Sequence, residues 1–135
     1  RGLNFEITEN TTGFDIDAAV REVLNANKPE GFEFSHSTGH GVGIMVHETP
    51  PRISSSEASK APLKPGMVFS IEPGLYNEKL GGVRIENTVA IAAKDGKARI
   101  RTLTRANLDD ALIDYDMLDE TEKRLLYEYK RLKIG

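Results

Sequence analysis

All three histidines of the chain, His36, His40 and His47, fall within one short segment. Histidine has a free pKa near neutrality and is the commonest metal ligand, so this clustering predicts a reactive centre. The same segment carries glycines, whose backbone can pass close to a ligand or a metal because it has no Cβ: Gly39, Gly41 and Gly43. A phosphate-binding loop would need a helix directly after these glycines, and the sequence predicts none. The alternative is three unrelated histidines with packing or surface roles.

Two carboxylates could complete a metal site with His40. Glu72 ends an apolar strand directly before Pro73-Gly74, a pair that cannot continue a central strand. Glu86 lies in an otherwise apolar strand, where a carboxylate is costly unless it is paired or bound to a cation. The alternative for Glu86 is an ion pair with Arg84 on the same face. One imidazole with several carboxylates suits Mn²⁺, Co²⁺, Fe²⁺ or Zn²⁺ and does not choose among them.

Strands are expected to position these side chains. The apolar run 67–71 predicts a buried strand, and residues 32–34 predict a short strand that leads into the histidines. The longest strand is expected over residues 82–93, followed by a tight hairpin at Asp95-Gly96 into residues 98–103. The period of two in the longest strand separates two faces: Arg84, Glu86 and Thr88 on one, and Val83, Ile85 and Val89 placed to pack.

Two helices and a polar loop complete the predicted elements. Residues 18–26 form an amphipathic helix, and the preceding Asp15 and Asp17 are expected to cap it rather than to bind a metal. Asp119, with Glu122 three residues later, predicts a capping box for a terminal helix. Residues 54–64 predict a surface loop. The apolar faces expected in core contact are Ile16, Val20, Val23 and Leu24 in the first helix, and Leu125, Leu126, Tyr129 and Leu132 in the second.

Composition excludes several classes of protein. The chain has 135 residues, which suits one domain with a real core. Its 18 basic and 21 acidic side chains give a net charge of −3, so no basic excess indicates nucleic-acid binding. The chain has no cysteine, which excludes disulfides and thiolate zinc sites. No apolar run approaches the roughly 20 residues of a membrane span. We expect a cytoplasmic protein, although a chain that starts at Arg1 does not allow targeting to be judged.

Three motifs together resemble the M24 metallopeptidases, and most closely aminopeptidase P and the proline dipeptidases. They are the histidine run from His36 through Val46-His-Glu-Thr-Pro50, Gly66-Met-Val-Phe-Ser-Ile-Glu-Pro-Gly-Leu-Tyr76 and Gly82-Val-Arg-Ile-Glu-Asn87. The resemblance implies an α+β protein with the pita-bread (creatinase/aminopeptidase-like) fold, a curved antiparallel sheet with flanking helices. It also implies a site for two divalent metal ions, Mn²⁺ before Co²⁺, Zn²⁺ or Fe²⁺.

The resemblance assigns roles to individual residues. His40 and Glu72 would bind one metal, Glu86 would bridge both, and Glu72 would also act as the general base. His36 would support proton movement or the tetrahedral intermediate, and His47 would contact the substrate near the scissile bond. Arg84 would orient the carboxylates, and Tyr76 would line the substrate site. The implied substrate is a peptide with proline at the second position.

The chain departs from the family pattern in two respects. The family has five metal ligands, two of them upstream aspartates that no segment here supplies. We therefore expect residues 1–135 to be the C-terminal half of a catalytic domain and to be inactive alone. The surface that the missing half would cover is expected to favour self-association, so that the chain forms a homo-oligomer. Asn87 stands where the family often has aspartate. This replacement changes none of the predicted metal ligands.

Two other functions remain open from the sequence. One is a non-catalytic pita-bread module that binds peptides or proteins, although such a module has no physical need for a full set of ligand side chains. The other is a small α+β domain with incidental histidines. Tight metal binding that is lost on His40→Ala separates the peptidase from this last alternative.

Overall fold

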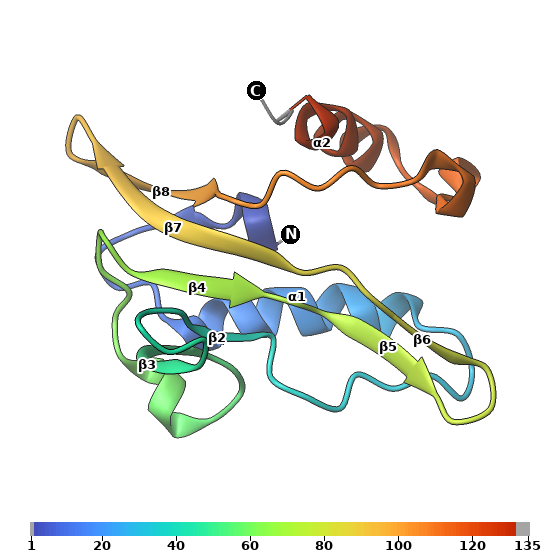
Figure 1. The fold of residues 1–135 in the computed structure, drawn as a ribbon, viewed down its shortest axis with the longest axis horizontal. Coiled ribbons are helices and arrows are strands. Elements are labelled where there is room, and N and C mark those ends of the chain that lie inside the picture. The colour runs from blue at the N-terminus through green and yellow to red at the C-terminus, as the bar shows by residue number, and fades with distance from the viewer. Residues whose placement is uncertain (1, 132–135) are drawn as a thin grey trace. The chain divides into compact units, whose positions relative to one another are not determined.

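The computed structural model describes residues 2–131, which divide into two compact units with the boundary between Leu103 and Thr104. The first unit contains every residue predicted to do chemistry. Its main element is a curled antiparallel sheet of six strands in the order β1-β8-β7-β4-β2-β3 (Figure 1). A separate two-stranded sheet pairs β5 with β6. The strands are β1 (Glu6–Ile7), β2 (Gly39–Gly41), β3 (Glu48–Ile53), β4 (Val68–Ile71), β5 (Gly74–Asn77), β6 (Gly81–Arg84), β7 (Asn87–Lys94) and β8 (Lys97–Thr102).

The core lies between this sheet and helix α1 (Gly13–Asn27). Phe69 of β4 faces its register partner Val89 of β7, and both are fully buried. Ile16 of α1 and Ile53 of β3 are also fully buried in the same cluster. Burial of side chains of this size contributes about 1.5–3 kcal/mol each, which fixes β4 between its neighbours.

Helix α1 starts earlier than predicted because its cap is Thr12. The Thr12 hydroxyl accepts a hydrogen bond from the Asp15 amide, and the Asp15 carboxylate accepts one from the Thr12 amide, which makes a capping box. The predicted capping role is therefore confirmed for Asp15. It is wrong for Asp17, which lies inside the helix with 1% of its surface exposed and forms an ion pair with Arg21.

The predicted hairpin is confirmed. Asp95 and Gly96 both have positive φ, 54° and 73°, which is the geometry of a two-residue turn that matches the strand twist. The turn joins β7 to β8 with Lys94 opposite Lys97.

The predicted strand over residues 82–93 is wrong as a single element. The chain forms β6, leaves the strand at Ile85 and Glu86, and then joins the main sheet as β7. Val89 is buried as expected, but Val83 and Ile85 are 67% and 47% exposed. A pattern of alternation continues across such a break, so it did not reveal that the two halves pair with different partners.

Other segments differ from expectation in smaller ways. Residues 32–34 contribute one bridge, between Glu33 and Tyr76, instead of a strand. The predicted loop 54–64 contains a 3-10 helix, η2 (Glu57–Lys60), and buries Ser54 and Ser59, whose hydroxyls lie 2.7 Å apart. Strands β2, β3 and β5 were not predicted from the sequence. Strand β3 carries Pro50 and Pro51, which lack an N–H, and it lies at the edge of the sheet, where proline is tolerated.

The second unit contains helix α2 (Glu120–Lys130) and two 3-10 turns, η3 (Asp110–Leu112) and η4 (Tyr115–Met117). The predicted capping box between Asp119 and Glu122 is confirmed. Leu125, Leu126 and Tyr129 are half-buried, so within the described residues the stripe is not a fully buried core; Leu132 lies outside them. Lys130 contacts both Asp110 and the Tyr115 hydroxyl, which ties α2 to the preceding turns.

Across residues 2–131, no helix has the length and apolar content that crossing a membrane requires.

Candidate metal centre

Three chain segments bring His40, Glu72 and Glu86 together. His40 lies in β2, Glu72 directly follows β4, and Glu86 lies between β6 and β7. Ile71 and Asn87 form the last pair of the antiparallel β4–β7 ladder, so the adjoining residues Glu72 and Glu86 lie close to each other. One ligand atom from each of the three side chains lies within 4.8 Å of the others. The arrangement can hold a divalent cation with one nitrogen and two carboxylate oxygens.

The glycines around His40 let neighbouring strands approach closely. A Cβ on Gly39 would lie 1.8 Å from the Ser70 carbonyl oxygen, and one on Gly41 would lie 2.2 Å from that of Glu48. Both clashes are with the backbone of a neighbouring strand. The two glycines therefore allow β2 to fit between β4 and β3 with His40 between them.

The imidazole of His40 is oriented for a cation. Its Nδ1 lies 2.9 Å from the Gly41 carbonyl oxygen, which can only accept, so Nδ1 carries the hydrogen. Nε2 then presents its lone pair to Glu72 Oε1 at 3.2 Å. Two electron-rich atoms at this distance repel unless a proton or a metal ion lies between them. The donor set of this site therefore fits a divalent metal.

Ser70 was missed by the sequence analysis and links two of these residues. It is fully buried, and its Oγ accepts a hydrogen bond of 3.0 Å from the His40 amide. The same hydroxyl donates to Glu72 Oε1 at 2.9 Å. One signal was available, because a hydroxyl inside the apolar run 67–71 must find a partner when buried.

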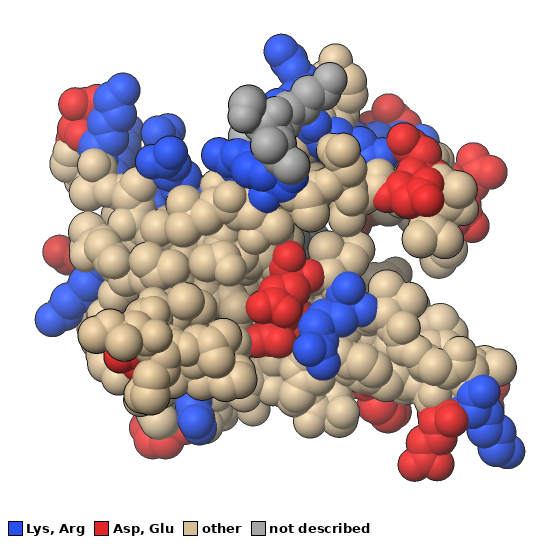
Figure 2. Space-filling view, viewed as in Figure 1, with Lys and Arg blue, Asp and Glu red and all other residues tan. Residues whose placement is uncertain are grey.

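Arg84 pairs with Glu72, and this differs from the alternative in which it neutralises Glu86. Its Nη1 lies 3.7 Å from Glu72 Oε2, and the structure gives no ion pair between Arg84 and Glu86 in the part of the chain it describes. The hydrogen bond with Tyr76 is the main cause that raises the pKa of Arg84, with smaller contributions from the charges of Glu72 and Glu86. Figure 2 shows acidic side chains beside basic ones where β4 approaches β5.

Tyr76 connects Arg84 to His36. Its hydroxyl accepts a hydrogen bond of 2.8 Å from Arg84 Nε, so its own hydrogen is available for His36 Nε2, also at 2.8 Å. This assignment agrees with the other ring nitrogen, because His36 Nδ1 lies 2.7 Å from the Ser37 carbonyl oxygen and must donate to it. For a neutral imidazole, the two contacts select the tautomer with the hydrogen on Nδ1.

The ring of His47 packs against the ring of His40. The His47 and His40 ring centroids are 4.1 Å apart, with the rings edge to face. The intervening loop exposes three apolar side chains, Ile44, Met45 and Val46. All the residues singled out from the sequence therefore lie in one region of the first unit, linked by the contacts given above.

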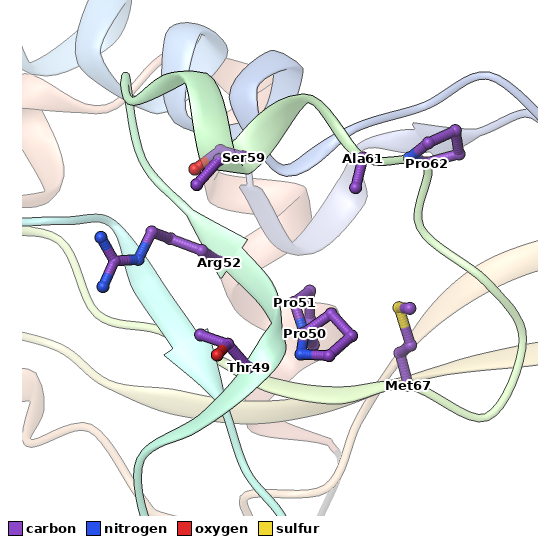
Figure 3. A pocket seen from close by; sticks show the side chains of 9 residues that line it. Thr49, Pro50, Pro51, Arg52, Ser59, Ala61, Pro62 and Met67 are labelled. Atoms are coloured by element: carbon purple, nitrogen blue, oxygen red, sulfur yellow. The ribbon is translucent and has the colours of Figure 1, made fainter.

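A separate depression of about 440 Å³ lies next to β3 (Figure 3). None of its lining residues is a histidine or a carboxylate, so it is distinct from the candidate metal centre. The lining consists of Thr49, Pro50, Pro51, Arg52, Ala58, Ser59, Ala61, Pro62 and Met67.

The chain is similar to known peptidases in sequence. The model of metallopeptidase family M24 matches residues 2–93. An Xaa-Pro dipeptidase from Pyrococcus furiosus is 46% identical over 91 residues, which cover 67% of this chain and 25% of that protein. The chain spans between a fifth and a quarter of the length of the curated relatives it matches.

Solved structures agree with this similarity. The prolidase from Pyrococcus furiosus superposes with a TM-score of 0.68 at 39% identity, covering 80% of this chain and 29% of that one. The X-prolyl aminopeptidase from Caenorhabditis elegans, described as a cytosolic enzyme with a di-nuclear active site, gives a TM-score of 0.79 at 29% identity and covers 96% of this chain and 22% of that one. The sheet described above is thus the pita-bread arrangement of these enzymes. The chain belongs to metallopeptidase family M24, among relatives that are Xaa-Pro dipeptidases and aminopeptidases.

Proposed function

We propose that the protein containing this chain hydrolyses the N-terminal peptide bond of Xaa-Pro peptides, with His40, Glu72 and Glu86 as three ligands of a dinuclear metal centre. The observation that supports this most directly is the convergence of one imidazole and two carboxylates within 4.8 Å from three separate segments. The names of the relatives support the substrate class.

The metal ions, for which we propose Mn²⁺ before Co²⁺, Zn²⁺ or Fe²⁺, would lower the pKa of a bound water and polarise the scissile carbonyl. The side chains of this chain would do the rest. Glu72 accepts the proton of the attacking water, and the Ser70 hydroxyl at 2.9 Å holds its carboxylate in place. Arg84 balances the negative charge of Glu72 and Glu86.

The histidines that do not bind metal would act on the substrate. His36, whose Nε2 contacts the Tyr76 hydroxyl, would support proton movement or the tetrahedral intermediate. His47 packs on His40 and would contact the peptide beside the metal. Proline after the scissile bond has no N–H, so the site need not supply an acceptor there.

We propose that residues 1–135 are the C-terminal portion of the catalytic domain. Two further metal ligands would come from a segment outside these residues. Three ligands cannot hold two metal ions well, so the chain alone is expected to be inactive. For the complete protein we also propose a cytoplasmic location, which the description of the Caenorhabditis elegans relative as cytosolic supports.

The test is release of the first residue from an Xaa-Pro tripeptide by the complete gene product and by this chain, with and without Mn²⁺. We expect metal-dependent activity in the complete protein only, and none on the matched Xaa-Ala peptide. Glu86→Gln should abolish it, whereas the exposed control Glu78→Gln should not. No hydrolysis by a metal-loaded complete protein would contradict the proposal and favour a binding module.

A further inference from the structure

Arg21 in α1 holds the segment that carries His36. In Figure 1 the chain leaves α1 and returns alongside it toward β2. The Arg21 guanidinium donates from Nη2 to the His36 carbonyl oxygen at 2.6 Å and from Nη1 to that of Phe34 at 3.3 Å. Its Nε donates to Asp17 Oδ2 at 2.8 Å. The planar fork of arginine can make these bonds together, which the single ammonium of lysine cannot do in the same geometry.

Asp17 binds the same segment at its C-terminal end, at Thr38. Its second carboxylate oxygen accepts a hydrogen bond of 2.7 Å from the Thr38 hydroxyl. Asp17 is 1% exposed and Thr38 is fully buried, so neither group has water as an alternative partner. The Thr38 carbonyl in turn accepts from the Glu72 amide at 2.7 Å. Thr38 therefore connects the Asp17–Arg21 ion pair in α1 to the backbone amide of Glu72.

Residues 34–38 have no strand ladder, and the contacts with Arg21 hold their backbone instead. Between the bridge at Glu33 and the start of β2, residues 34–38 are irregular. The carbonyls of Phe34 and His36 accept from Arg21, and the Ser37 carbonyl accepts from the His36 ring. The Arg21 guanidinium also lies 4.3 Å over the Phe34 ring, whose edge packs on the His36 imidazole at 4.9 Å.

We propose that Asp17 and Arg21 are positioning residues that fix the imidazole of His36 for the reaction. The proposal rests on the proposed function for its kinetic readout, but not for its structural one. Arg21 sets the backbone on which His36 stands and the ring that His36 packs against. Asp17 orients Arg21 and anchors Thr38, so the two residues act through His36 without touching substrate.

The test uses Arg21→Lys in the complete gene product. Lysine keeps the charge opposite Asp17 but loses the fork to the two carbonyls. We expect kcat on an Xaa-Pro tripeptide to fall by about 10- to 100-fold with KM nearly unchanged, because small misplacements of a reacting group have effects of this size. The ring ¹⁵N signals of His36, assigned by their loss in His36→Asn, should shift from the single-tautomer pattern. Lys28→Gln is the matched control, because it breaks another contact from α1 to this segment, the 2.6 Å ion pair with Glu33, and should change neither readout.

Unchanged His36 signals and unchanged kcat in Arg21→Lys would overturn the proposal. Should Arg21→Lys not accumulate as folded protein, Asp17→Asn, which keeps side-chain volume, gives the same two readouts and the same decision. A wild-type protein that cleaves no Xaa-Pro peptide would contradict the proposed function, while the ¹⁵N signals would still decide whether Asp17 and Arg21 position His36.

Discussion

Ser70 is the residue through which the buried strand β4 holds both His40 and Glu72. Its hydroxyl accepts from the His40 amide and donates to the Glu72 carboxylate, so one side chain sets the relative position of two proposed ligands. A hydroxyl at this position restricts the Glu72 carboxylate without adding charge to the site.

Ser70→Ala is expected to lower the free energy of unfolding by about 1–3 kcal/mol, because the buried His40 amide loses its acceptor. Metal affinity should fall by about 10- to 100-fold, the usual effect of removing a hydrogen-bond partner of a ligand. Denaturant unfolding and metal titration measure the two quantities. The exposed Ser55→Ala is the matched control. A Ser70→Ala protein that behaves like Ser55→Ala in both would contradict this role.

At this scale the sequence predicted identities better than contacts. His40, Glu72 and Glu86 could be named as candidate ligands because each stands where a polar side chain is hard to explain otherwise, and their ligand atoms lie within 4.8 Å of one another. The contacts of Ser70 and Asp17 could not be placed, since Ser70 bonds His40, 30 positions away, and Asp17 bonds Thr38, 21 positions away. A pattern along the chain carries no information about which distant group satisfies a buried hydroxyl or carboxylate.

Among the elements, β2 depends most on close backbone approach. A Cβ on Gly39 would lie 1.8 Å from the Ser70 carbonyl oxygen of β4, and backbone cannot move away as a side chain can.

Gly39→Ala is therefore expected to destabilise the first unit by about 3 kcal/mol or more. The control is Gly2→Ala, whose added Cβ would meet only the ends of the Val20 and Ile71 side chains, at 3.0 Å. Thermal unfolding compares the two variants. Equal melting temperatures would mean that β2 does not pack against β4 as described.

The contact of Asp110 with Lys130 and Tyr115 should make the second unit sensitive to pH. The hydrogen bond from Lys130, followed by that from Tyr115, lowers the pKa of Asp110 below its ordinary value of 3.8. A depressed carboxyl pKa stabilises the fold above the unfolded value and loses this effect as pH falls through the folded one. The pKa of Lys130 is raised above 10.5 chiefly by the same bond, so its contribution is lost only when pH rises beyond that value.

Hydrogen exchange of the α2 amides, corrected for intrinsic rates, should therefore show more protection at about pH 6 than at about pH 2.5. Asp110→Asn should remove most of this difference, and the exposed Asp116→Asn should not. The groups are exposed, so salt should weaken the effect. A pH difference that survives in Asp110→Asn would assign it to other residues.

Elements were predictable where a local signal stood alone. The capping box at Asp119 and the Asp95-Gly96 hairpin are complete within a few residues, and both are confirmed. The break at Ile85 and Glu86 was not predictable, because alternation continues through it while the strand partner changes from β5 to β4. The bulged, glycine-rich β2 is too short to show any period.

The whole molecule exposes apolar side chains that suggest an interface. Leu80 and Val83, from the turn and strand around β6, are 77% and 67% exposed. Single exposed apolar residues are common, but neighbouring ones mark contact surfaces more often. We therefore propose that the complete protein is a homo-oligomer, as expected from the sequence.

Light scattering of the complete protein should therefore give a mass above that of one chain. Val83→Glu should raise the dissociation constant by about tenfold or more, equivalent to about 1.4 kcal/mol. Glu78→Gln, in the same hairpin, is the control. A monomeric wild-type protein would contradict the proposed homo-oligomer.

We propose that His40, Glu72 and Glu86 hold metal ions, and this is tested most directly by the location and number of ions bound to the complete gene product. Crystals grown with Mn²⁺ and measured at its absorption edge should show two ions per chain, with these three side chains as ligands. His40→Ala should lose at least one ion, whereas His47→Ala, which removes the ring packed on His40, should keep both. Ions bound elsewhere, or two fully occupied ion sites in His40→Ala, would contradict the assignment of His40, Glu72 and Glu86 as metal ligands.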